Sequence, residues 1–309
     1  MRGAIVVLDD AWQDILSKRS EAGAYPEPVQ NLLGEMAAAC VLMQANIKFN
    51  GALVLQVQGD GPLKMAVAEV QPDFAVRATA TLRGELAANA TLSDMVNVNN
   101  EGRCAITLDP KDRLPGQQAY QGIVPLFDDN GQKINQLSEV LQHYMLQSEQ
   151  LDTCMVLAAN GERAAGLLIQ RLPLAGEGNL AGQAQSNEDG IGKSEDYHRI
   201  ATLASSLKPE ELLSLDVETV LHRLFWDEPI ARFIAPQGVE RPRFQCSCSK
   251  ERVSNMLRSL GAEEVQSIIA ERGDVEVGCE FCGAMYRFDS VDSAQLFTDA
   301  SATPPDALQ

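Results

Sequence analysis

The sequence lacks the features that would place it in several common classes of protein. No uninterrupted apolar run reaches the roughly 18 residues that a membrane-spanning helix requires, and the N-terminus lacks the basic, then apolar, then small-residue order of a secretory signal. Only three histidines are present, and no Ser/His/Asp or Cys/His constellation is recognisable around them. We therefore expect a cytoplasmic protein with no membrane partner, in which thiols stay reduced and structural disulfides are rare.

Positive charge is also scarce. The chain has 25 Lys and Arg residues against 43 Asp and Glu residues, which gives a formal net charge of −18. A field of this sign repels phosphate backbones and anionic membrane surfaces, so we expect no nucleic-acid partner. It favours solubility, which suits a protein that periodically exposes apolar surface.

Two loops contain residue types found in ligand sites, but neither has the full pattern. Residues 59–62 (Gly-Asp-Gly-Pro) lack the lysine and the glycine spacing of a phosphate-binding loop, and they predict a hairpin turn between two strands. Residues 128–131 (Asp-Asp-Asn-Gly) could be taken for a metal loop, but such a cluster is more often a solvated turn. We count neither loop as a candidate site.

The first half of the chain has the patterns of an α+β domain. Apolar residues recur at three- and four-residue steps over 26–47, which predicts a core helix, and residues 74–82 alternate like a half-buried strand. Strand runs broken by a few helices favour the α+β class. The other predicted strands are 3–8, 53–58, 63–68, 103–108, 119–125, 153–159 and 164–172, and the other predicted helices are 9–19, a short helix with Thr91 as N-cap, and 133–150.

The composition changes between about residues 174 and 196, where Gly, Gln, Asn, Ser and Glu dominate. Short helical patterns follow over 197–227, and none is long enough to be stable without a partner. Such marginal helices are candidates for local unfolding. The predicted organisation is a core domain at 1–173, a flexible and then helical metastable linker at 174–239, a zinc-binding domain at 240–292 and a disordered tail at 293–309.

Four of the seven cysteines occur in two close pairs separated by residues 249–278. This arrangement predicts a four-thiolate zinc site that holds one ion per chain. The first pair has one intervening residue, whereas zinc-binding pairs normally have two. The three single cysteines are predicted to be buried and inert. The pairs are Cys246 with Cys248 and Cys279 with Cys282, and the single cysteines are Cys40, Cys104 and Cys154.

The residues around the pairs predict a small module. Ser249 is placed to cap a helix that ends at Gly261, a second helix ends at Gly273, and Gly283 supplies a turn that other residues disfavour. A module of this size has too little core to fold alone. A structural zinc would contribute on the order of 10–16 kcal/mol at neutral pH.

The same four thiolates could bind zinc permanently, as a structural site, or release it on oxidation, as a switch. If the metal leaves, each pair is close enough to form a local disulfide, but such bonds no longer join the first pair to the second. Oxidation should then unfold the module. Most four-cysteine sites are permanent staples, and a zinc ribbon that contacts nucleic acid or protein has the same ligands. The unusual first pair and the marginal helices beside it favour the switch.

At these residues the chain resembles the redox-regulated bacterial holdase chaperones, the thirty-three-kilodalton heat-shock chaperonin family. The resemblance covers nearly the whole length. Its most specific parts are residues 246–252 (Cys-Ser-Cys-Ser-Lys-Glu-Arg) and 279–282 (Cys-Glu-Phe-Cys). Supporting stretches are residues 58–62, 120–124, 148–151 and 210–213.

The resemblance implies a mechanism. Zinc would be held by Cys246, Cys248, Cys279 and Cys282 in the reduced, inactive protein. Oxidants would form the Cys246–Cys248 and Cys279–Cys282 disulfides and expel zinc, after which the linker near 190–235 unfolds and homodimers form. The active form would hold unfolding client proteins without ATP and pass them to ATP-dependent foldases. The family fold implies an N-terminal β/β/α layered sandwich, and the protein would not be an enzyme.

Two alternatives come from other functional classes. A zinc-stapled, constitutively folded adaptor would use the same ligands. A thiol–disulfide oxidoreductase would use Cys279 and Cys282, but that pair lacks the βαβ context of thioredoxin-like proteins.

Overall fold

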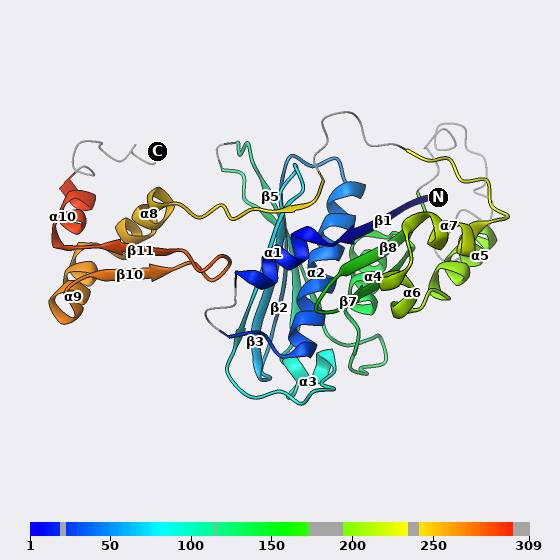
Figure 1. Ribbon diagram of the computed structural model, residues 1–309, viewed down its shortest axis with the longest axis horizontal. Coiled ribbons are helices and arrows are strands. Elements are labelled where there is room, and N and C mark those ends of the chain that lie inside the picture. Colours follow the sequence, from blue (N-terminus) through cyan, green and yellow to red (C-terminus); the bar gives the residue numbers. More distant parts are fainter. Residues whose placement is uncertain (19–22, 115, 173–193, 234–240, 299–309) are drawn as a thin grey trace. The chain divides into compact units, whose positions relative to one another are not determined.

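The structure is a computed structural model that describes residues 1–18, 23–114, 116–172, 194–233 and 241–298 (Figure 1). The chain divides into two compact units, Met1–Gln245 and Cys246–Gln309. Among the described residues, no helix is long and apolar enough to cross a membrane. Both helices and sheets are present, so the predicted α+β class is confirmed.

A six-stranded sheet forms one side of the first unit. Its strand order is β6-β5-β2-β3-β4-β9, and its pairings are antiparallel except for the parallel pair β4–β9. The turn at 59–62 joins β2 to β3 as the sequence predicts. The strands are β2 (Gly51–Gln58), β3 (Leu63–Val70), β4 (Ala75–Leu82), β5 (Arg103–Pro110), β6 (Tyr120–Pro125) and β9 (Arg243–Phe244).

A three-stranded antiparallel sheet with the order β1-β8-β7 forms the second layer of strands. Its strands are β1 (Arg2–Leu8), β7 (Thr153–Ala159) and β8 (Ala164–Gln170). All of β8 is buried, because successive side chains point to opposite faces and both faces are covered. Ala164 and Leu168 join the main core, whereas Leu167 and Ile169 face a second apolar cluster.

Helix α2 lies between the two sheets and contacts both of them (Figure 1). The two sheets and the helices of the expected sandwich are therefore present, with one helix packed between the sheets. Its small residues permit close packing: a Cβ atom on Gly34 would lie 2.4 Å from the Cβ atom of Ala159. The helices of this part are α1 (Asp10–Ser17), α2 (Glu27–Asn46), α3 (Leu92–Val96, capped by Thr91 as predicted) and α4 (Leu137–Glu149).

Three short helices cover the other face of the three-stranded sheet. They are α5 (Glu195–Ser205), α6 (Pro209–Ser214) and α7 (Val217–Phe225). Ser194 and Asp216 cap α5 and α7 through their side chains, and Pro209 is the first residue of α6. These helices lie within the predicted linker. The predicted flexible segment runs from about 174 to 196; its residues up to 193 lie outside the described residues, and its last two residues begin α5.

The second unit contains two helices, a strand pair and a last helix. Its elements are α8 (Lys250–Leu260), α9 (Ala262–Arg272), β10 (Val275–Gly278), β11 (Met285–Phe288) and α10 (Ser290–Thr298). The predicted tail from 293 overlaps α10, which continues through 298 because Leu296 is buried in the small core of this unit. The unit begins at Cys246 rather than at 240, because residues 243–245 are hydrogen-bonded to β4 of the first unit.

Candidate metal centre

The four paired cysteines meet at one point. Their Sγ atoms all lie within 4.8 Å of one another, and each thiol is half-buried. The shortest separations cross between the two pairs: 3.6 Å from Cys246 to Cys279 and 3.3 Å from Cys248 to Cys282. None of the seven cysteines, all of which lie in the described part of the chain, forms a disulfide. The structure thus brings together every residue that the sequence analysis selected as a metal ligand.

Local backbone structure positions each pair. Cys279 and Cys282 lie in the turn between β10 and β11, where Gly283 has a φ of 70°, a left-handed conformation that glycine adopts without strain. Hydrogen bonds close this turn, from Gly283 N to Cys279 O at 2.8 Å and from Cys279 N to Ala284 O at 2.9 Å. The predicted role of Gly283 is confirmed.

The first pair leads directly into α8. Ser249 caps this helix by accepting a hydrogen bond from Arg252 N at 3.2 Å, as the sequence predicts. The Arg252 guanidinium donates to Ser247 Oγ at 2.7 Å, so the residue between the two cysteines is itself held by the helix. The helix N-terminus carries partial positive charge, which stabilises nearby thiolates.

One partner of the cluster escaped the sequence analysis. The Tyr286 hydroxyl donates a hydrogen bond to Cys248 Sγ at 3.1 Å. Tyr286 lies on β11, and its pKa is raised to about 12, first by the hydrogen bond to Cys248. The sequence signal was an aromatic residue four positions after Cys282, but the sequence alone does not show that its hydroxyl reaches the other pair.

The electrostatics of the cluster favour a bound cation. Burial opposes ionisation of Cys246, but hydrogen bonds from the Cys248 backbone and from the neighbouring thiols lower its pKa to about 7. Burial raises the pKa of both Cys279 and Cys282. Thiols this close cannot all ionise without a compensating positive charge, because each thiolate repels the next.

The donor set fits zinc. A tetrahedral zinc site with Zn–S distances of ~2.3 Å places its sulfurs about 3.8 Å apart, and the observed separations of 3.3 and 3.6 Å lie close to that value. Four sulfur ligands in a tetrahedral arrangement select zinc or an iron–sulfur centre. A metal held here would join residues 246–248 to residues 279–282 across two helices and a strand.

The second unit has a small apolar core. Its apolar core consists of Val253, Leu257, Val265, Val275, Phe288 and Leu296. The three single cysteines are buried in the first unit, as predicted, and burial raises their pKa. They contribute nothing to the metal centre.

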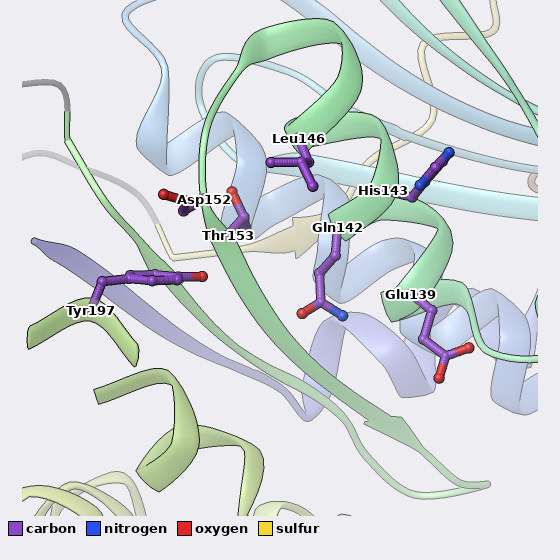
Figure 2. Close-up of a pocket in the computed structure, with 7 residues that line it drawn as sticks. All are labelled: Glu139, Gln142, His143, Leu146, Asp152, Thr153 and Tyr197. Carbon is purple, nitrogen blue, oxygen red and sulfur yellow. The ribbon is translucent and has the colours of Figure 1, made fainter. Parts of the chain in front are cut away.

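A cavity of about 360 Å³ lies elsewhere in the first unit, between α4, the start of β7 and α5 (Figure 2). Its lining residues are Glu139, Gln142, His143, Leu146, Asp152, Thr153 and Tyr197. Asp152 is already paired with Arg171 at 2.8 Å. The loop at 128–131 is a turn, as predicted, because Asp128 Oδ1 accepts hydrogen bonds from Asn130 N and Gln132 N. We assign neither place a catalytic role.

Comparison with known proteins gives a consistent result along the whole chain. The family model described as "Hsp33 protein" matches residues 1–289. The chain is 44% identical over 297 residues to the 33 kDa chaperonin of Chromobacterium violaceum, an alignment that covers 96% of this chain and 90% of that protein. It is 42% identical over 306 residues to the 33 kDa chaperonin of Methylobacillus flagellatus, covering 98% and 92%.

The fold is also found in a solved structure. The crystal structure of the 33 kDa chaperonin (heat shock protein 33 homolog) of Thermotoga maritima matches with a TM-score of 0.70 at 19% identity. The match covers 97% of this chain and 95% of the other.

Proposed function

Because the chain belongs to the Hsp33 family, we propose that it is an ATP-independent chaperone whose holdase activity is switched on when its four paired cysteines are oxidised. The clustering of these four thiols carries the proposal, since it joins two distant segments of a unit with a small core. Its activity is binding rather than catalysis. The clients are unfolding proteins, as the chaperonin name of the relatives implies.

In the reduced state the four cysteines hold one zinc ion per chain as thiolates. Zinc supplies positive charge and a fixed geometry that joins the two pairs. On oxidation, each disulfide forms as two thiolates give an electron pair to one molecule of peroxide, which takes up protons and leaves as water. A sulfur in a disulfide no longer binds the metal as a thiolate, so the centre is lost.

The pairing of the disulfides decides whether the second unit unfolds. The shortest Sγ separations cross between the pairs, and they last only while the two segments are held together. Without it, only the partners within a pair stay close, because they are separated by one or two residues and loop closure is easiest there. We expect Cys246–Cys248 and Cys279–Cys282, which leave the two segments unconnected.

The client-binding surface comes from the first unit. Helices α5–α7 bury an apolar cluster on the outer face of β7 and β8, and each helix is too short to be stable alone. If they detach after the second unit unfolds, this cluster becomes available to clients and to a second copy of the chain. The proposal includes a homodimer in the oxidised state, transfer of clients to ATP-dependent foldases, and a cytoplasmic location.

The test follows zinc release and suppression of client aggregation together, during peroxide treatment at mildly elevated temperature. The expected result is zinc loss in parallel with the gain of chaperone activity, with disulfides within each pair identified by mass spectrometry. Zinc retention would favour a constitutive adaptor, and turnover of a dithiol substrate would favour an oxidoreductase. Disulfides between the pairs would overturn the unfolding step, because such bonds would replace the connection that zinc provides.

A further inference from the structure

Strand β9 ends two residues before the first metal ligand and forms the edge of the six-stranded sheet. It pairs in parallel with β4 through only two residues, Arg243 opposite Ala75 and Phe244 opposite Val76. The backbone hydrogen bonds that hold it include one from Arg243 N to Phe74 O and one from Gln245 N to Val76 O, both at 3.2 Å. This edge of β4 therefore already accepts an added strand.

Two side chains of β9 occupy defined positions on this edge. The Arg243 guanidinium donates to Asp73 Oδ2 at 2.6 Å and to Asp73 O at 2.8 Å. Phe244 packs against the main core, and the Lys18 ammonium lies 5.8 Å from the centre of its ring. The edge thus accommodates a basic residue followed by an aromatic residue in an extended chain.

The rest of the edge is protected in another way. The backbone groups of alternate residues point to the same side of a strand. The backbone N–H and C=O groups of Ala78 and Ala80 therefore point away from β3, as those of Phe74 and Val76 do. At Ala80, the Tyr25 hydroxyl accepts a hydrogen bond from the backbone N at 2.9 Å and donates to the backbone O at 3.2 Å. Covering an edge in this way prevents other chains from pairing with it.

We propose that the outer edge of β4 around residues 73–78 captures an extended, basic-aromatic segment of an unfolding client by strand addition, and that β9 occupies this place in the reduced protein. The inference rests on the proposed function, because it identifies one mode of client binding. Unfolding of the chain after Gln245 leaves β9 held by its two-residue pairing, and so short a strand opens by local unfolding. Strand addition provides backbone affinity with little demand on sequence.

The occupant is a client rather than a second copy. The β9 of a second copy would only replace the chain's own β9 by identical contacts, so exchange between copies gains no pairing. A client segment that is longer than the two-residue β9 can extend the pairing along β4. Unfolding proteins supply such segments, because their chains expose extended apolar stretches.

The experiment uses the full-length protein and a fluorescent peptide, Arg-Pro-Arg-Phe-Gln-Thr-Val-Thr, whose first five residues copy residues 241–245. The matched control peptide is N-methylated at the second Arg and at Gln, which removes the two N–H donors and keeps every side chain. We expect the unmodified peptide to bind the oxidised protein about tenfold or more tightly than the reduced, zinc-loaded protein. The N-methylated peptide should lose at least about tenfold in affinity.

Competition in the same samples separates this inference from the proposed function. The peptide should reduce suppression of client aggregation by the oxidised protein. If the oxidised protein suppresses aggregation but the peptide neither binds nor competes, the edge inference fails and the proposed function stands. Equal affinity of the two peptides would also overturn it, because the backbone would then play no part. If the peptide dissociates the dimer without displacing clients, the occupant is a second copy and the client assignment is wrong.

Discussion

The two units of the chain are stabilised by different means. The first unit buries two sheets and helix α2 in an extensive apolar core, whereas the second unit has a core of six buried apolar residues and a cluster of four thiols. Burial of apolar surface does not depend on redox conditions, but thiolate–metal bonds do. The comparison predicts that oxidation acts first on the second unit, while the main core around α2 stays folded.

Removing zinc from the reduced protein is the most severe test of this difference. A chelator should abolish protection of the backbone amides in α8 and in β10–β11, because a structural zinc contributes on the order of 10–16 kcal/mol. The amides of α2 should keep their protection, since its burial is independent of metal. Hydrogen exchange measured by mass spectrometry gives both results in one sample, and restored zinc should restore protection. Continued protection of α8 without metal would show that its apolar core is sufficient.

Matched truncations compare the two cores directly. Leu257 in α8 is 1% exposed and Leu33 in α2 is fully buried, so Leu257→Ala and Leu33→Ala should each cost about 2–5 kcal/mol. In the second unit, folding and metal binding are coupled. Leu257→Ala should therefore weaken zinc affinity by about 30-fold or more. Leu33→Ala should lower the thermal midpoint of the first unit and leave zinc affinity unchanged. Equal effects of the two variants on zinc affinity, measured by chelator competition, would contradict the distinction.

The hydroxyl of Tyr286 offers a smaller perturbation within the metal centre. Tyr286→Phe removes the hydrogen bond to Cys248 Sγ and keeps the ring. The loss of one such bond costs about 1 kcal/mol, which corresponds to roughly a fivefold fall in zinc affinity. The thiolate also becomes more nucleophilic, so zinc should be released faster by peroxide. Tyr120→Phe, at an exposed tyrosine of β6, is the control and should change neither quantity.

The sequence predicted those parts of the structure that depend on local chemistry. The cap at Ser249, the turn at Gly283 and the grouping of the four cysteines follow from residue types and short spacings, and the structure contains all three. Most strands of both sheets were predicted from equally local signals, namely short apolar runs, one alternating stretch and the turn at 59–62.

The features that escaped prediction depend on partners far away in the sequence. Strand β9 has two residues and hence no periodicity, and it exists because Asp73 and Val76 lie beside it in space. The contact of Tyr286 with Cys248 spans 38 positions. Helix α10 occupies the start of the predicted tail and is stabilised by the burial of Leu296. Composition alone does not indicate that this side chain is buried.

The smallest expected effect lies at the boundary between the two units. Asp73→Asn removes the charge that pairs with Arg243, and because both side chains are partly exposed the loss should be about 0.2–1 kcal/mol. The Gln245 amide, which donates to Val76 O, should then exchange up to a few-fold faster. Glu85→Gln, which removes one exposed carboxylate elsewhere, is the control. Zinc affinity should fall by no more than the same few-fold, because coupling between the docking of β9 and the metal centre is reciprocal and Cys246 follows β9 after one residue. If zinc affinity and peptide binding are both unchanged, β9 docking is independent of the metal centre, and oxidation would not open the edge of β4.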